Sequence, residues 1–150
     1  MTDLPRTARY SLPLLALAQA QKEVTHNEAL VLLDALVQAA VVAGPIADPP
    51  SAPEEGQCWL VAAGASGAWA GHGGKLAVRT GGGWRYVTPG AGFRLTRQSD
   101  GAALYFDGTA WIAPPTIATP AGGVTIDVEA RSAIAAFVLL LEAHGLLISG

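Results

Sequence analysis

The feature that most constrains the fold is the apolar stretch near the end of the chain, residues 127–145. Asp127 is a good N-cap, because its carboxylate can accept hydrogen bonds from the exposed amides of a first helical turn. Gly145 can take the left-handed conformation that ends a helix. Residues 133–141 are all apolar, whereas a surface helix normally has a single apolar stripe. The sequence therefore predicts a helix covered by its own domain or by copies of itself, and self-association is the first hypothesis.

The chain is also poor in charged side chains. Hydrophobic residues make up 51% of its 150 residues and charged residues only 14%, against about a quarter in an average soluble domain. A monomer of this composition has difficulty covering its surface with polar groups, and burial in an oligomer removes that difficulty. The net charge of −3 and the absence of any run of Lys or Arg argue against a nucleic-acid partner.

Three features indicate a protein that folds in the cytoplasm without oxidation. Cys58 is the only cysteine, which excludes an intrachain disulfide, and its strand-like surroundings favour a buried, inert thiol. The early apolar stretch is interrupted by Pro13, Gln19 and Gln21, so we expect no signal peptide. The terminal apolar run is shorter than the roughly 20 residues of a transmembrane helix, so we expect no membrane insertion.

Segments rich in proline and glycine divide the chain into residues 1–45, 54–115 and 127–145. The first part combines an irregular start with a helix, the second is a small antiparallel domain of β-hairpins, and the third is the terminal helix. The predicted fold class is therefore α+β, with an N-terminal helix, a β-hairpin domain and a C-terminal oligomerising helix.

The N-terminal helix is predicted from about residue 26 to residue 40. Thr25 and Glu28 match a capping box, in which each side chain bonds the backbone near the other. Asp34 and Gln38 lie on one side of this helix, opposite an apolar face that packs either on the chain's own sheet or along a partner. The apolar face consists of Ala29, Leu32, Leu33, Leu36, Val37 and Ala40.

The middle part changes character, with dense glycine and short apolar runs that predict strands. Residues 75–89 and 103–114 share the order strand, glycine turn, Trp and Pro. We interpret them as two hairpins of one sheet, with Trp84 and Trp111 in related positions. The predicted strands are residues 57–61, 75–79, 84–87, 93–96, 104–107 and 110–112.

No group of side chains has the spacing of a catalytic or metal site. His26, His72 and His144 are far apart, and no His or Cys pair has the spacing of metal ligands. Asp100 and Asp107 flank a hairpin, where turn formation explains them. The glycine-rich stretches do not lead into a helix and lack the Lys-Ser/Thr ending of a phosphate loop. The sequence therefore predicts a protein that is not an enzyme and that carries no metal or cofactor.

Aromatic side chains are the remaining candidates for ligand binding. An exposed aromatic ring can stack on a sugar, and the candidates for glycan binding are Trp69, Trp84 and Trp111. Trp69, in a loop of small residues, is the one expected to be exposed. The alternative is that these rings fill the core of a domain rich in glycine and alanine.

Several segments resemble a known family. Residues 19–28 read Gln-Ala-Gln-Lys-Glu-Val-Thr-His-Asn-Glu. This block, together with residues 53–61 and 67–71, is similar to an uncharacterised domain family (domain of unknown function 2793). The family occurs in tailed phages, prophages and gene transfer agents of alphaproteobacteria. The resemblance spans about residues 8–113 and supplies no catalytic residues.

The resemblance implies a virion structural protein of a phage or gene-transfer-agent tail, made in the bacterial host cytoplasm. A tail fibre or baseplate-peripheral protein is the expected role, with host attachment as its context. Fibres are commonly trimers, which implies a homotrimer. A heptad with Ile134 and Leu141 at a, and Phe137 and His144 at d, gives a short seam for the terminal helix. The predicted oligomerisation residues are Ile134, Phe137, Val138 and Leu141.

The N-terminal part is the candidate for attachment to other tail or baseplate proteins, because an extended, glutamine-rich start and an amphipathic helix can lie along a partner. The attachment candidates are Gln19, Gln21, Lys22, His26 and Asn27. A carbohydrate-binding module that recognises a host surface glycan is the alternative. A glycan-degrading enzyme has no support, because no paired carboxylates are suggested.

Overall fold

The structure is a computed structural model that describes residues 4–16, 22–123 and 127–148. Over these residues it contains two α-helices and two mostly antiparallel sheets. The predicted α+β class, with an N-terminal and a C-terminal helix, is therefore confirmed. No helix in this described part of the chain is long and apolar enough to cross a membrane.

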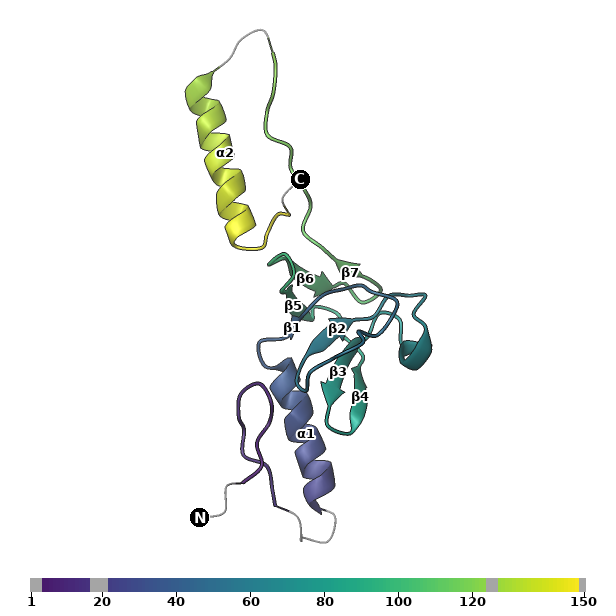
Figure 1. Cartoon of the computed structure of the whole chain (residues 1–150). Helices are drawn as coiled ribbons and strands as arrows, with labels where there is room; N and C mark the ends of the chain where they lie inside the picture. Colours follow the sequence, from purple (N-terminus) through teal and green to yellow (C-terminus); the bar gives the residue numbers. More distant parts are fainter. Residues whose placement is uncertain (1–3, 17–21, 124–126, 149–150) are drawn as a thin grey trace. The chain divides into compact units, whose positions relative to one another are not determined.

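The chain divides into two compact units, residues 1–89 (unit 1) and residues 90–150 (unit 2). Helix α1 (Lys22–Leu36) belongs to unit 1 and helix α2 (Val128–Ala143) to unit 2 (Figure 1).

Unit 1 is built on a three-stranded antiparallel sheet in the order β2–β3–β4. Its strands are β2 (Cys58–Leu60), β3 (Leu76–Thr80) and β4 (Gly83–Val87), which confirms the strands predicted there. A two-residue strand, β1 (Ala40–Val41), falls where the helix was expected to end. The chain then runs along β2, where Val42 N donates to the Cys58 carbonyl at 2.8 Å.

Both faces of this sheet are covered, so β2 and β3 are almost entirely buried. On one face, Trp59 packs against Trp69 of the short 3₁₀ helix η1 (Gly67–Trp69), with ring centroids 6.4 Å apart. The other face carries Arg85, whose guanidinium bonds Glu28 of α1. Unit 1 therefore has three layers: helix, sheet and loop.

The bounds of α1 differ from the prediction at both ends. The helix already begins at Lys22, so Thr25 lies inside it and the predicted capping box is wrong. At the other end, Gln38 has a left-handed φ of 49°. The Arg9 guanidinium donates to the carbonyls of Asp34, Ala35 and Gln38 at 3.1, 2.7 and 3.2 Å. This tertiary cap satisfies the last carbonyls of the helix and ends it at Leu36.

The side of α1 that unit 1 buries is not its most apolar side. Asp34, expected to lie away from the apolar face, is only 3% exposed. Leu33 and Val37, members of the predicted apolar face, remain half exposed. The helical spacing is as predicted, but these two residues do not pack into the core of unit 1.

Unit 2 contains an antiparallel arrangement of β5 (Arg94–Arg97), β6 (Ala103–Phe106) and β7 (Trp111–Ile112). These strands confirm the three predicted for this part of the chain. The hairpins β3–β4 and β6–β7 belong to two different sheets, so the interpretation of residues 75–89 and 103–114 as hairpins of one sheet is wrong. Trp111 packs against Phe93 and Phe106, with ring centroids 5.9 and 5.4 Å apart.

Two aspartates shape the turns of unit 2, as the sequence predicted. Arg97 Nε donates to Asp100 Oδ1 at 2.9 Å, and this hydrogen bond holds the pKa of the Asp100 carboxyl below its ordinary value. Asp107 Oδ1 accepts from Ala110 N at 2.8 Å and Thr109 N at 2.7 Å. These backbone donors lower the pKa of Asp107 in the same direction.

Helix α2 carries both of its predicted end signals. Asp127 Oδ1 accepts from Ala130 N at 2.9 Å, which confirms the N-cap. Gly145 has a φ of +68°, and Leu146 N donates to the Leu141 carbonyl at 2.9 Å. This is the Schellman arrangement, which favours glycine at its left-handed position.

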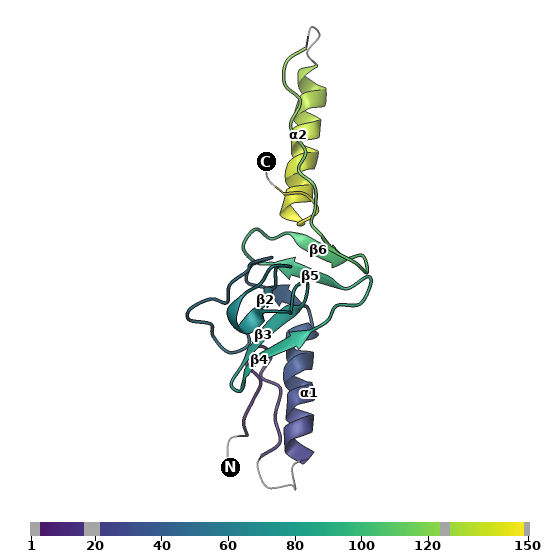
Figure 2. The same cartoon turned by 90° about the vertical axis from the view of Figure 1, so that its right-hand side faces the viewer.

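One side of α2 is covered by its own chain. Residues 113–120 run beside the helix in both views (Figures 1 and 2), and Ile148 N donates to the Pro115 carbonyl at 3.1 Å. Val138 is the buried residue of the helix, at 8% exposure. Val138 was predicted as an oligomerisation residue, but in this conformation it is not accessible to a second copy.

Candidate interaction sites

The N-terminal segment is fastened to α1 by the buried carboxylate of Asp34. Oδ1 accepts from Thr7 Oγ1 at 2.7 Å and from Tyr10 N at 2.8 Å, while Oδ2 accepts from Arg9 N at 2.8 Å. A buried charge is tolerated when donors surround it in this way. The three partners lie 24 to 27 residues before Asp34, so no local sequence pattern points to them.

A second pair of hydrogen bonds holds the N-terminal segment at Asn27, about two turns nearer the start of α1. Leu15 N donates to Asn27 Oδ1 at 2.9 Å, and Asn27 Nδ2 donates back to the Leu15 carbonyl at 3.0 Å. Leu14 N also donates to the Pro5 carbonyl at 2.8 Å. Residues 5–15 therefore form a closed loop beside α1 (Figure 2), which we call the N-terminal loop.

The residues predicted for attachment are only partly described. Gln19 and Gln21 lie outside the described residues, and so does the side chain of Lys22. His26 is exposed on α1. Asn27 is half-buried and its amide is already paired with Leu15. The attachment role therefore stays a prediction, with His26 as its exposed described residue.

Of the three tryptophans proposed for glycan binding, one is a core residue and two are half-buried. Trp69 is 0% exposed, so the expectation that it is the exposed ring is wrong, and it has no surface on which a sugar can stack. The alanine and glycine residues around it let the 3₁₀ turn fold the indole inward. Trp84 is half-buried and packs edge-on against Trp69, with centroids 5.1 Å apart. Trp111 is also half-buried. Of the rings proposed to bind a glycan, only the half-buried Trp84 and Trp111 still offer part of their surface to a sugar.

Within the described residues, the side chains that could bind a metal do not lie together in one site. No set of three or more His, Cys, Asp or Glu residues in the described ranges could hold a metal ion. Burial raises the pKa of the Cys58 thiol to about 11, which keeps it protonated and unreactive at neutral pH. The His72 ring stacks on Tyr86 with centroids 3.5 Å apart.

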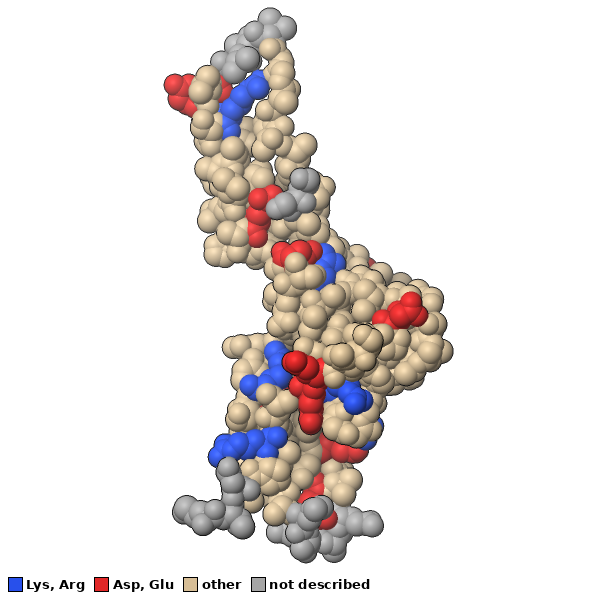
Figure 3. All heavy atoms as spheres, in the orientation of Figure 1, with Lys and Arg blue, Asp and Glu red and all other residues tan. Residues whose placement is uncertain are grey.

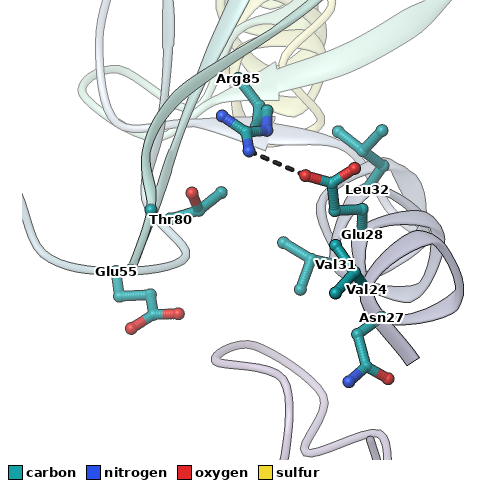
Figure 4. Close-up of a pocket in the computed structure, with 10 residues that line it drawn as sticks. Val24, Asn27, Glu28, Val31, Leu32, Glu55, Thr80 and Arg85 are labelled. Carbon is teal, nitrogen blue, oxygen red and sulfur yellow. Dashed lines mark hydrogen bonds and ion pairs between the residues drawn. The ribbon is translucent and has the colours of Figure 1, made fainter. Parts of the chain in front are cut away.

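A groove lies between α1 and the β3–β4 hairpin and encloses about 390 Å³. Figure 4 shows Val24 and Val31 on its helix side and Glu55 and Thr80 on its strand side. We call it the α1 groove. Sequence analysis missed it, because its two walls are far apart in the chain. Its lining residues are Val24, Asn27, Glu28, Val31, Leu32, Glu55, Thr80, Gly81, Gly82 and Arg85.

The outer surface of α2 is the second candidate interaction surface. Away from Val138, the helix leaves large apolar side chains open to water. Figure 3 shows few charged side chains on the visible face of this part of the chain. The large apolar side chains exposed along the helix are Val128, Ile134, Phe137, Leu139 and Leu140.

Comparison with known proteins identifies the family of this chain. The sequence profile of a family described as "Protein of unknown function (DUF2793)" matches residues 26–112. The chain belongs to this family. A search among curated proteins finds no match.

The DUF2793 match covers most of α1 and every strand described above, and it ends before α2 begins. Both sides of the α1 groove fall inside it, apart from Val24. The groove is thus a feature of the DUF2793 region, whereas the apolar surface of α2 lies outside that region.

Proposed function

We propose that this protein is a structural component of a phage or gene-transfer-agent tail, an oligomeric tail fibre or baseplate-peripheral protein rather than an enzyme. Membership of the DUF2793 family and the resemblance of residues 19–28 support the tail context. The observation that carries the oligomeric role is the apolar surface left open on α2.

Unit 2 exposes more large apolar side chains than it buries. Its buried hydrophobic residues among those described are Leu95, Ala102, Leu104, Val138 and Leu147. Such a small core stabilises a unit of this size only weakly. Covering α2 adds the missing burial, because each square ångström of apolar surface removed from water contributes about 25 cal/mol.

The proposed seam is centred on Phe137, which is 65% exposed. An aromatic side chain offers about 150–250 Å² of surface, so Phe137 alone leaves on the order of 100 Å² in water. Ile134 and Leu140 lie one turn away on the same side, at i−3 and i+3. Leu141 is half-buried and borders the seam. Leu140 therefore replaces the buried Val138 in the predicted set.

A second copy of the same helix fits this surface better than a charged partner. Residues 132–141 carry no charged side chain, so a charged partner would lose hydration without finding a counter-charge. The helix itself is an uncharged apolar surface of matching length. We propose a trimer, in which three copies of α2 surround a common axis and cover one another's apolar seams.

The test is the solution mass of the full chain, measured by light scattering beside two variants. We expect the wild type to have the mass of three chains and Phe137→Asp that of one. Val128→Asp is the matched control, because Val128 is 64% exposed but lies on another side of α2. An aspartate there also suits the positive end of the helix dipole.

Circular dichroism must show that each variant keeps its helix content. A wild type that is monomeric at all concentrations contradicts the proposal, and so does a folded Phe137→Asp variant with the wild-type mass. Truncation at Pro120 is a poorer test, because it removes the buried Leu147 from the core of unit 2.

A further inference from the structure

The α1 groove combines an aliphatic wall with an acidic rim. Val24, Val31 and Leu32 supply the wall, and none of the lining residues that the structure describes is aromatic. The volume of about 390 Å³ is in the range of ligand pockets, roughly 300–1,000 Å³. A chain of methylene groups therefore finds apolar surface here, whereas a planar group finds no ring on which to stack.

Most polar groups at the rim already have partners. Arg85 Nη2 donates to Glu28 Oε1 at 2.8 Å and closes one end of the groove (Figure 4). Thr80 Oγ1 donates to the Gly83 carbonyl at 2.9 Å. The side-chain amide of Asn27 is occupied by Leu15. A ligand therefore meets few free donors in this groove.

Glu55 is the exception. Within the described residues its carboxylate has no hydrogen bond or ion pair. It rests over Gly81, where an added Cβ would lie 3.4 Å from Glu55 Oε2. With Glu28 balanced by Arg85, the described lining of the groove carries an unbalanced negative charge at Glu55. An ionised carboxylate only accepts hydrogen bonds, so the matching ligand group is a cationic donor.

We propose that the α1 groove binds a lysine side chain presented by a partner polypeptide, with Val24, Val31 and Leu32 against its methylene groups and Glu55 as its counter-charge. Lysine joins an unbranched aliphatic stem to a compact terminal cation. Arginine gains most binding energy where its guanidinium can stack on aromatic rings, and the described lining of the groove offers none.

The glycine turn favours a lysine that is part of a polypeptide. Gly81 and Gly82 form part of the rim without side chains, and beyond its chain neighbours a Cβ on Gly82 would meet its nearest described atoms at 3.9 Å. A partner's main chain can therefore approach this edge while its side chain enters the groove. The site lies wholly in unit 1 and does not depend on assembly through α2.

The test is a titration of the full-length protein, with Val and Leu methyl groups labelled for NMR. The probe is the blocked peptide acetyl-Ala-Lys-Ala-amide, and acetyl-Ala-norleucine-Ala-amide is the uncharged control. We expect saturable shifts at Val24, Val31 and Leu32 with the lysine peptide. Binding should weaken about fivefold with norleucine or with Glu55→Gln, the upper range for an exposed ion pair. Glu54→Gln, the neighbouring exposed carboxylate, should leave binding unchanged.

Equal binding of the two peptides, or unchanged binding in Glu55→Gln, overturns the proposal, as does the absence of saturable shifts at the three methyl-bearing residues. If 1,5-diaminopentane binds as tightly as the lysine peptide, the ligand need not be part of a polypeptide, and that part of the proposal is overturned. The same titration on Phe137→Asp should match the wild type, so failure of the groove and failure of the oligomeric role are separate results.

Discussion

Asp34 is the residue on which the N-terminal loop depends most. Its carboxylate joins Thr7, Arg9 and Tyr10 to α1 from a position only 3% exposed. Loss of the carboxylate leaves three donors without their acceptor, and a buried unsatisfied group costs about 1–3 kcal/mol.

We therefore predict that Asp34→Ala lowers the free energy of unfolding by about 3 kcal/mol, measured by urea denaturation. Asp48→Ala is the control, because Asp48 is exposed and its side chain accepts, among the described residues, from Ser66 alone. Its effect should stay below about 1 kcal/mol. Equal effects of the two substitutions would show that the N-terminal loop does not depend on Asp34.

The residues that sequence reasoning misjudged are those whose surroundings come from distant parts of the chain. Asp34 was placed correctly on the polar side of a helix, but the N-terminal loop that covers this side carries no local signal. Trp69 was expected to be exposed because its neighbours are small, yet the same small neighbours allow Trp59 and Trp84 to close around it. Burial of a single side chain is a tertiary property.

At the scale of elements, local sequence signals predicted a helix or strand correctly wherever no distant part of the chain alters its ends. The strands of both units follow their short apolar runs and glycine turns, and α2 follows its N-cap and its terminal glycine. The predicted C-terminal bound of α1 was wrong because Arg9 caps this end from outside the helix. The α1 groove was missed for the same reason, since Glu28 and Arg85 are 57 residues apart.

The turns of unit 2 should weaken in acid. The pKa values of Asp100 and Asp107 lie below the ordinary 3.8, so their charged forms are favoured by folding. Their contribution to stability is fully present above about pH 4 and is lost as the pH falls through the folded pKa values.

We predict that the melting temperature of the wild type falls below pH 4, and that this fall is smaller in Asp107→Asn. The asparagine oxygen can still accept from Thr109 N and Ala110 N, but it does not titrate. Calorimetry at pH 7 and pH 3 measures the difference. Parallel pH profiles for the two proteins would mean that Asp107 does not contribute to acid sensitivity.

At the scale of the whole molecule, the apolar surface of α2 links stability to concentration. If copies of the chain cover Phe137 and its neighbours, unfolding also separates those copies, and mass action then favours the folded oligomer at higher protein concentration. A monomer whose helix is covered by its own chain has no such dependence.

We therefore predict that the melting temperature of the wild type rises when the protein concentration is raised a hundredfold. The Phe137→Asp variant should melt at one temperature throughout, since closing the seam would bury its charge without a partner. Val128→Asp should follow the wild type, because Val128 is equally exposed but lies outside the seam. If the wild type melts at the same temperature at every protein concentration, α2 is covered only by its own chain, and the proposed oligomeric role is wrong.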